Sequence, residues 1–439
     1  MEKSMVMSKL EALGGVILQA AKEQGVQYAQ CTVSEREKRE FNVDGGSFSL
    51  MRTLFDRDVI ITVLKDQKKG SVRINRFDED AVLEAVRECV ASSESAEADD
   101  AWAFADSPVE KDFLDGEPEC DLEALFDRSR ELMDQIREKH PKILMEQMIT
   151  EHDRVEKVFM STNSVKYRTL GGCYHFSLMY SAHDGEKSSS FFGSDVTLSK
   201  LDRPILECAM IEKELSAIEQ QLDTQPLEGK FTGTAVLAPA AMSEIVLSTI
   251  LDNYVSDSSL IDATSIWEDS LGQKVADERF SMSMTPYADY VVMGDRYTSE
   301  GFVSEGFDII RNGILKSFDL SQYGANKTGN ERAKCEGWNL TVESGDTPLE
   351  QIISSIDRGV LVLRFSGGQP AASGEFSGVA KNSFLIENGK VTHALSEVMV
   401  SGCVRDMLKN VRAISQETLR DGTVSIPYIA FDGVTISGK

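Results

Sequence analysis

Histidines are the first residues to consider, because imidazole groups hold catalytic zinc in many hydrolases. Such a site needs protein ligands, an open position for water and a nearby carboxylate base, and an H-E-x-x-H or H-E-x-x-x-H helix supplies most of this set. The chain has five histidines, and none has another within five positions, so neither motif occurs in any register. We interpret them as ordinary surface or core residues. They are His140, His152, His175, His183 and His393.

Glycine-rich motifs give no clearer sign of catalysis. The sequence has no G-x-x-x-x-G-K-[ST] phosphate loop, no G-x-G-x-x-G after a strand and no G-x-S-x-G nucleophile elbow. The stretch 366–370 follows a predicted strand but lacks both a phosphate-loop lysine and a following helix. We therefore interpret it as a tight turn.

The seven cysteines also lack a functional pattern. Their number is odd and no C-x-x-C pair occurs, which is typical of reduced thiols in the cytosol rather than of a disulfide framework or a structural zinc site. We expect a cytoplasmic protein. The cysteines are Cys31, Cys89, Cys120, Cys173, Cys208, Cys335 and Cys403.

The charge of the chain excludes two classes of partner. Its formal net charge is −26, from 72 acidic and 46 basic residues. A negative field repels phosphate backbones and anionic lipid. The densest basic stretch, 65–76, is short and is predicted to form strand and turn, so it supplies no basic patch. No run approaches the roughly 18 apolar residues of a membrane span. The apolar stretch 12–21 repeats at spacings of three and four, so it predicts an amphipathic helix and not a secretion signal. We expect neither nucleic-acid nor membrane binding.

The elements that would position a site follow an α+β order in the first half, with an antiparallel sheet and helices. The acidic, proline-containing stretch 93–119 reads as an exposed connection. Pro141 ends the last helix before the second group of strands. After the first helix, we predict strands at 28–35, 39–52, 57–74, 143–160, 165–181 and 188–198, and helices at 79–91, 122–136 and 204–222.

The second half reads as a β-rich domain around a buried helix. The helix is predicted at 240–254, and Asn-Gly pairs at 312–313 and 388–389 predict hairpins within 309–318 and 384–400. The chain, at 439 residues, is too long for one ordinary core. We predict two domains, 1–225 and 226–439, divided in a segment with Pro226 and Gly229. The other predicted elements are strands at 232–237, 359–365, 424–431 and 433–437 and a helix at 404–411.

Ordered landmarks along the second half closely resemble the TldD/PmbA (TldE) peptidase family. No single landmark is decisive, but their order and spacing together make a chance match very improbable. The first half resembles the family only in its element order and short pieces. The landmarks are VLAP at 236–239, TSIWEDSLGQKV at 264–275, SEG at 299–301, DIIRNGILK at 308–316, KTGN at 327–330, SGEFSG at 373–378, FLIENG at 384–389, SEVM at 396–399, SGCVRDML at 401–408 and ISG at 436–438.

The resemblance implies a cytosolic peptidase system in which TldD-type and PmbA-type chains associate. In the TldD-type chain, an H-E-x-x-x-H helix and a later cysteine hold zinc, and the glutamate activates water. Carried over here, the ligand positions are Ser248, Asn253 and Asp421, and the base position is Thr249. A shift of one residue does not restore the motif, because no histidine lies between positions 183 and 393. Cys403 is too early to be the late ligand and reads as a small buried residue.

Three functions follow as hypotheses. The first is a PmbA/TldE-like subunit that shapes or regulates a peptidase whose zinc sits in a TldD-type partner, with peptide substrates, and that forms a homodimer when alone. Glycine-rich strands of the second half would then accept a peptide as an added strand, although the same glycines fit turns and bulges equally well.

The second hypothesis is a hydrolase that uses other residues, with Glu244, Asp252, Glu300 and Asp421 as candidates. A chain with 72 acidic residues will place a few carboxylates together by chance, which argues against this hypothesis. The third is a peptide-binding or regulatory protein without a TldD-type partner. The older family label, modulator of DNA gyrase, belongs to this third class. The acidic charge argues against direct contact with DNA.

Overall fold

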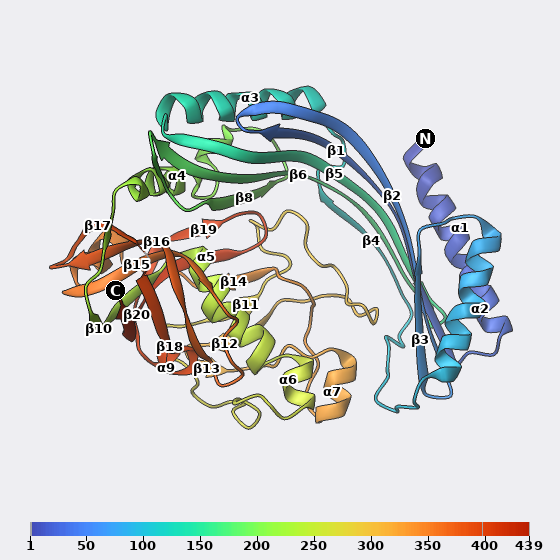
Figure 1. The fold of residues 1–439 in the computed structure, drawn as a ribbon. Helices are drawn as coiled ribbons and strands as arrows, with labels where there is room; N and C mark the ends of the chain where they lie inside the picture. The colour runs from blue at the N-terminus through green and yellow to red at the C-terminus, as the bar shows by residue number, and fades with distance from the viewer. Residues whose placement is uncertain (1, 397, 439) are drawn as a thin grey trace.

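The computed structural model describes residues 2–396 and 398–438, which form two β-sheets joined by helices and loops (Figure 1). Glu397, part of one landmark, lies outside the described residues. The first sheet has eight strands and the second has twelve. Figure 1 shows the first sheet, in blue to green, as a long surface curved around the second half. The predicted α+β class is confirmed.

The strands of the first sheet are longer than predicted. The expected breaks at 36–38 and 53–56 are wrong, because β1 and β2 pair without interruption through both stretches. Arg36, on the inner face, also forms an ion pair with Asp153 of β5 at 3.1 Å. The strand expected at 57–74 instead turns at Asp66 and Gln67, both of positive φ. The order is β3-β2-β1-β5-β6-β4, with β7 and β8 also on β6. The strands are β1 (Tyr28–Asp44), β2 (Ser47–Lys65), β3 (Lys68–Ile74), β4 (Val109–Gly116), β5 (Ile143–Ser161), β6 (Val165–Asp184), β7 (Lys187–Ser188) and β8 (Phe192–Leu198).

The stretch 93–119 is more ordered than an exposed connection. Its β4 pairs in parallel with β6, and Asp115 within β4 is only 7 % exposed. A carboxylate so deeply buried needs a cationic partner, and the sequence around it gives no sign of one. The partner comes from the second half of the chain and is described with the site below.

Helices cover the outer face of the curved sheet. α1 (Glu2–Glu23) and α2 (Glu79–Ser95) cover one end, and α3 (Leu122–Lys139) covers the other (Figure 1). The helix expected at 204–222 is shorter, because α4 (Ile211–Glu219) alone is α-helical and the 3₁₀ turns η1 (Ile205–Glu207) and η2 (Gln220–Leu222) flank it. In the described part of the chain, no helix is long and apolar enough to cross a membrane.

The second sheet holds both predicted hairpins. Asn312-Gly313 and Asn388-Gly389 lie in their turns with positive φ, as the sequence predicts. Its strands are β9 (Thr224–Pro226), β10 (Lys230–Leu237), β11 (Met282–Met284), β12 (Phe307–Arg311), β13 (Ile314–Leu315), β14 (Leu340–Val342), β15 (Arg358–Gly367), β16 (Glu375–Glu387), β17 (Lys390–Ser396), β18 (Val398–Cys403), β19 (Val411–Arg420) and β20 (Ser425–Ser437). The short helices α6 (Asp257–Ile261), α7 (Gln322–Thr328) and α8 (Leu349–Ser354) were not predicted, whereas α9 (Val404–Lys409) was.

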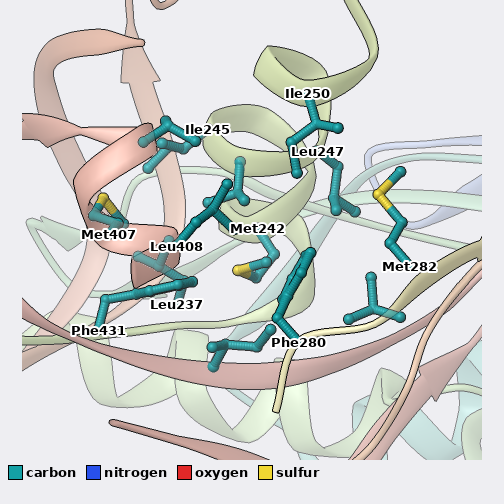
Figure 2. Packing of buried hydrophobic residues seen from close by; sticks show 14 of the residues in the cluster. Leu237, Met242, Ile245, Leu247, Ile250, Phe280, Met282, Met407, Leu408 and Phe431 are labelled. Atoms are coloured by element: carbon teal, nitrogen blue, oxygen red, sulfur yellow. The ribbon is translucent and has the colours of Figure 1, made fainter. Parts of the chain in front are cut away.

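A buried helix runs through the core of the second half, as predicted. It begins as α5 (Pro239–Met242) and continues as the π-helical segments η3 (Ser243–Leu247) and η4 (Thr249–Tyr254). Figure 2 shows Ile245 lying towards Met407 and Leu408 of α9, and Leu247 and Ile250 lying towards Met282 of β11. Burying each such side chain contributes about 2 kcal/mol. Apolar burial therefore fixes this helix, and of its polar residues Ser248 is partly exposed whereas Thr249 is buried.

The boundary expected at 225/226 falls inside β9, which pairs with β17. One hydrophobic cluster also crosses it, joining Phe41 and Phe176 of the first sheet to Val236 and Tyr428 of the second. The two halves therefore share part of their core. The division into domains 1–225 and 226–439 stays a prediction.

Candidate functional site

The helix that carries three of the predicted site positions is wound in the π register. The backbone amide of Ser248 bonds to the carbonyl of Ser243, five residues earlier. The amide of Val255 bonds to the carbonyl of Ile250 in the same way, at 3.1 Å. π-Helical segments are rare and often occur at functional sites. This backbone is therefore a candidate site even before its side chains are considered.

The π register bears directly on an H-E-x-x-x-H spacing. In an α-helix of 3.6 residues per turn, residues five apart point about 140° away from each other. A π-helix bonds each residue to the fifth one along, so residues five apart lie on the same side of the helix, one turn apart. Ser248 and Asn253 are such a pair. The backbone therefore presents these two positions on one face, as two ligands of one metal would require.

The side chains at these positions are held by backbone carbonyls. Ser248 Oγ and Thr249 Oγ1 each donate to the carbonyl four residues earlier, at 2.9 and 2.6 Å. Asn253 Nδ2 donates to the carbonyl of Pro370 at 3.3 Å. Hydrogen bonds from a serine or threonine hydroxyl to the carbonyl four residues earlier are common inside helices. All three side chains thus stabilise the helix and the loop beside it.

The loop over this helix is the glycine-containing turn between β15 and β16. The tight turn expected at 366–370 is wrong, because Ser366 and Gly367 still pair within β15 and a longer loop, 368–374, leads to β16. Gly374 closes the loop with φ +86°, and a Cβ there would lie 1.9 Å from Tyr254 Oη. The loop therefore packs closely on the polar side of the helix.

Asp421 lies at a different place, where the two halves meet. Its carboxylate accepts hydrogen bonds from the amides of Thr423 and Val424 at 2.8 and 2.9 Å. Its carbonyl accepts from the amide of Thr197 in β8 at 2.6 Å. Burial raises the pKa of its carboxyl, and the two amide donors oppose the rise. No hydrogen bond or ion pair of the described residues joins Asp421 to the three helix positions.

The four carboxylates proposed for a different hydrolase have different surroundings. Glu244 accepts from the amide of Phe365 at 2.6 Å, and burial raises its pKa. Asp252 is exposed, Glu300 lies in a pocket beside Glu336, and Asp421 lies at the junction just described. The four do not form one group.

The structure has a cleft between the halves that the sequence did not predict. It encloses about 890 Å³ between the inner face of the first sheet and a loop of the second half. Pockets of this size are typical of ligand sites. The cleft is lined from the sheet side by Arg36, Asp56, Asp58, Asp115, Val155 and Lys157, among others, and from the loop side by Met293, Gly294 and Asp295.

Buried polar contacts hold the loop against the sheet at the edge of this cleft. Arg296 Nε lies 2.9 Å from both carboxylate oxygens of Asp115, which is the cationic partner that β4 requires. The ammonium of Lys157 lies 4.8 Å from the ring centroid of Tyr297, and burial lowers its pKa. In the sequence, the inner face of the first sheet is indicated by the alternation of charged residues along β1 and β5. This alternation predicts a polar face but does not show that a loop of the second half covers it.

A second, smaller pocket gathers carboxylates beside the same loop. It encloses about 270 Å³ and is lined by Glu300, Asp319 and Glu336. Burial raises the pKa of Glu336 to about 7, and the negative charge of Glu300 adds to the rise. Burial raises the pKa of Asp319 to about 6. Glu336 also accepts from the amide and hydroxyl of Ser299, at 2.9 and 3.0 Å, so it helps to fix the loop.

Comparison with known proteins assigns this arrangement to a family. Residues 229–438 match the model described as the PmbA/TldA metallopeptidase C-terminal domain. A metalloprotease PmbA homolog of Haemophilus influenzae is 25 % identical over 406 residues, covering 86 % of this chain and 85 % of that protein. The chain belongs to the PmbA/TldD metallopeptidase family.

Solved structures show that the family's fold extends over both halves. TldE from Thermococcus kodakarensis superimposes with a TM-score of 0.84 and 20 % identity, covering 96 % of this chain and 99 % of that one. A protein of Thermotoga maritima, described as a candidate modulator of a DNA gyrase, gives a TM-score of 0.81 at 17 % identity, covering 97 % and 100 %. At these identities the likeness establishes a TldE-like fold alone.

A PmbA/TldD metallopeptidase implies a bound metal, and the residues present can be tested against zinc. Zinc takes thiolate, imidazole and carboxylate ligands. The hydroxyls of Ser248 and Thr249 already donate to carbonyls, and the amide nitrogen of Asn253 donates as well. Across residues 2–396 and 398–438, no group of three or more His, Cys, Asp or Glu side chains is placed to hold a metal ion. The three helix positions therefore do not fit zinc, and the Asp421 carboxylate lies apart from them and already accepts from two amides.

The substitution Glu336→Gln is expected to change how stability depends on pH. The pKa of Glu336 rises from 4.5 to about 7 on folding, so ionising it in the folded state costs stability as pH rises through that window. Relative to the wild type, the variant should gain about 2 to 3 kcal/mol in unfolding free energy between pH 5 and pH 8. Urea unfolding at both pH values measures this gain. The exposed Glu331→Gln serves as a control, and an equal gain there would contradict the assignment.

Proposed function

We propose that this member of the PmbA/TldD family is a PmbA/TldE-like subunit of a cytoplasmic two-chain metallopeptidase and leaves zinc to a TldD-type partner. The observation that carries the proposal is the π-wound helix. Its backbone suits two ligands five residues apart, while Ser248, Thr249 and Asn253 supply neither ligand nor base. A fold retained around such a helix supports a role in shaping the enzyme rather than in holding its metal.

The cleft between the halves is where we place the peptide substrate. It carries both signs of charge, with Arg36 and Lys157 beside Asp115 and Asp295. Such a lining can accept the alternating donors, acceptors and charged side chains of an extended peptide. In this proposal the partner's zinc activates water, and the residues of this chain hold and orient the peptide.

Reconstitution with a TldD-type homologue from the same cell tests the proposal. Each chain alone and the mixture are assayed on an unfolded peptide, with and without a chelator. We expect chelator-sensitive hydrolysis only in the mixture. Replacing the partner's motif glutamate should abolish it, whereas the triple variant S248A/T249V/N253A of this chain should retain it. Failure to associate, or a TldD-type chain equally active alone, would contradict the proposal.

A variant in the cleft separates substrate binding from assembly. Lys157→Glu should raise KM about tenfold, equivalent to roughly 1.4 kcal/mol of lost binding, without changing association of the two chains. The exposed Lys213→Glu, which lies on α4 outside the cleft, is its matched control. An unchanged KM in the cleft variant would remove the cleft from the proposal.

Hydrolysis by this chain alone is the second candidate. One observation favours it: the carboxyl of Glu336, with a pKa of about 7, lies beside Glu300 in a pocket. A carboxyl that titrates near neutral pH can act as a general acid or base. Chelator-insensitive hydrolysis by the isolated chain, abolished by Glu336→Gln, would support this candidate. Purification from the native cell without a TldD-type chain and without hydrolysis would instead favour a binding or regulatory protein.

A further inference from the structure

The outer face of the first sheet has a polar stretch between its two groups of helices. Val33 and Val158 lie in the apolar cluster with α1 and α2. Phe41 and Met148 lie in the cluster with α3, and Figure 1 shows α3 at one end of these strands and α1 and α2 at the other. Alternate residues of a strand share one face. The outward residues of β1 and β5 between the two clusters are Glu35, Glu37, Arg39, His152, Arg154 and Glu156.

A pocket of about 440 Å³ lies over this polar stretch. It is lined by β1 and β5, by the segment 118–120 and by Val6 of α1. The segment passes close to the sheet because β6 has a glycine there. A Cβ on Gly172 would lie 2.2 Å from the carbonyl oxygen of Glu117, and the same oxygen lies 2.8 Å from His152 Nε2. Backbone packing and a buried side chain therefore fix this side of the pocket.

Glu156 is a buried carboxylate in the pocket lining with one unsatisfied oxygen. Its side chain belongs to a residue only 2 % exposed. Oε1 accepts a hydrogen bond from Arg154 Nη2, whereas no described residue donates to Oε2. A buried carboxylate oxygen without a donor is unfavourable, because it has lost water and gained nothing in exchange. Glu156 therefore favours a ligand that brings N–H donors and a positive charge.

Two arginines give the same pocket the opposite charge. Arg39 Nε donates to Glu37 at 2.6 Å, and Arg154 donates to Glu156. A guanidinium has five N–H donors in a planar fork, so one such bond leaves others that can hold a carboxylate. Burial lowers the pKa of His152, which keeps its imidazole neutral at neutral pH. The pocket thus presents an acceptor for an ammonium group and donors for a carboxylate.

The spacing of these groups suits a dipeptide. Arg39 reaches along β1 to Glu37, which lies opposite Arg154, so its guanidinium is near that level of the sheet. Glu156 is two residues farther along β5, a step of about 7 Å. An extended dipeptide also spans about 7 Å from its ammonium group to its carboxylate.

We propose that this pocket binds a dipeptide with free termini, on the face of the sheet opposite the cleft. The ammonium group donates to Glu156 Oε2, and the carboxylate accepts from Arg39. A volume of about 440 Å³ leaves room for the two side chains of the dipeptide. The inference does not rest on the proposed function, because it uses neither the cleft nor a second chain.

Isothermal titration calorimetry of the full-length chain with L-alanyl-L-alanine tests the inference. We expect binding at one site with Kd below about 1 mM. N-acetylation removes the ammonium group of the dipeptide and C-terminal amidation removes its carboxylate, so each should weaken binding at least tenfold. Free alanine is too short to reach both groups and should also bind at least tenfold more weakly. These comparisons use the wild type and do not depend on the folding of any variant.

Variants assign the binding to this pocket. E156Q and R39Q should each weaken L-alanyl-L-alanine binding at least tenfold. E88Q removes a carboxylate from the exposed face of α2 and should leave binding unchanged. K157E, in the cleft on the other face of the sheet, should also leave it unchanged. Thermal unfolding of each variant checks that the fold is kept.

The opposite results would overturn the inference. One is no binding of the dipeptide by the wild type at concentrations up to about ten times the expected Kd limit. Another is equal binding of the acetylated or amidated dipeptide, because the pocket would then not read the two termini. Binding that K157E abolishes and E156Q leaves unchanged would place the dipeptide in the cleft, which would overturn this inference and support the proposed function.

Discussion

Gly422→Ala is expected to destabilise the chain by about 3 to 4 kcal/mol, the largest effect of any single methyl group that we predict. Gly422 has φ +92°, and a Cβ there would lie 2.0 Å from the carbonyl oxygen of Thr197 in β8. That oxygen belongs to backbone fixed in the first sheet, so it cannot move aside cheaply. The neighbouring bond from the Thr197 amide to the Asp421 carbonyl, at 2.6 Å, would be strained or lost as well.

Gly433→Ala is the matched control for this effect. Gly433 has φ +84°, but nothing lies within 4 Å of the position that a Cβ would take there. It should therefore show only the cost of placing alanine in a left-handed conformation, about 1 to 2 kcal/mol. Urea unfolding of both variants measures the difference. Equal losses of unfolding free energy in the two variants would show that the close approach of the two halves at Gly422 adds nothing to the cost of the substitution.

Restoring two ligands to the π-wound helix is expected to create a zinc site. In the variant S248H/N253H, the register places both imidazoles on one face, so zinc should bind the folded state selectively. At a zinc concentration about 100 times Kd, the variant should gain about 2.7 kcal/mol over its metal-free form. The wild type should show no comparable gain. Titration calorimetry and thermal unfolding with and without zinc provide the measurement.

The spacing control for this site is S248H/D252H, which has the separation that suits an α-helix. This pair lies close to one face in either register, because a π turn closes between four and five residues, so S248H/D252H should bind zinc whichever register holds. Zinc binding by S248H/D252H but not by S248H/N253H would contradict the π geometry on which the functional proposal rests, because only in an α-helix do residues five apart diverge. The result thus tests the backbone and not only the side chains.

Local signals in the sequence predicted much of the fold. The Asn312-Gly313 and Asn388-Gly389 turns were correct, because each depends on residues that tolerate positive φ and on their immediate neighbours. The helices α2 and α3 were correct as well, since Asp78 and Asp121 cap them, each accepting from a backbone amide three residues on. Such features need no knowledge of the rest of the chain.

Long-range pairing explains the errors. The stretches 36–38 of β1 and 53–56 of β2 were read as breaks, yet they lie opposite each other in the sheet, with Arg36 across from Asp56. β4 has little pattern of its own and becomes a strand because β6 lies beside it. In each case the stabilising partner is distant in sequence, so composition within a short window could not reveal it.

The sequence by itself determined that this chain has no H-E-x-x-H or H-E-x-x-x-H motif, because a motif depends only on residue types and their spacing. Tertiary structure decided the rest of the site. The π register, which puts Ser248 and Asn253 on one face, accompanies close packing of the helix against β11, α9 and the loop that Gly374 closes. Asp421 was expected beside them but is bound to Thr197 of the first half. Contacts between residues hundreds of positions apart set these placements, and they form only when both halves fold together.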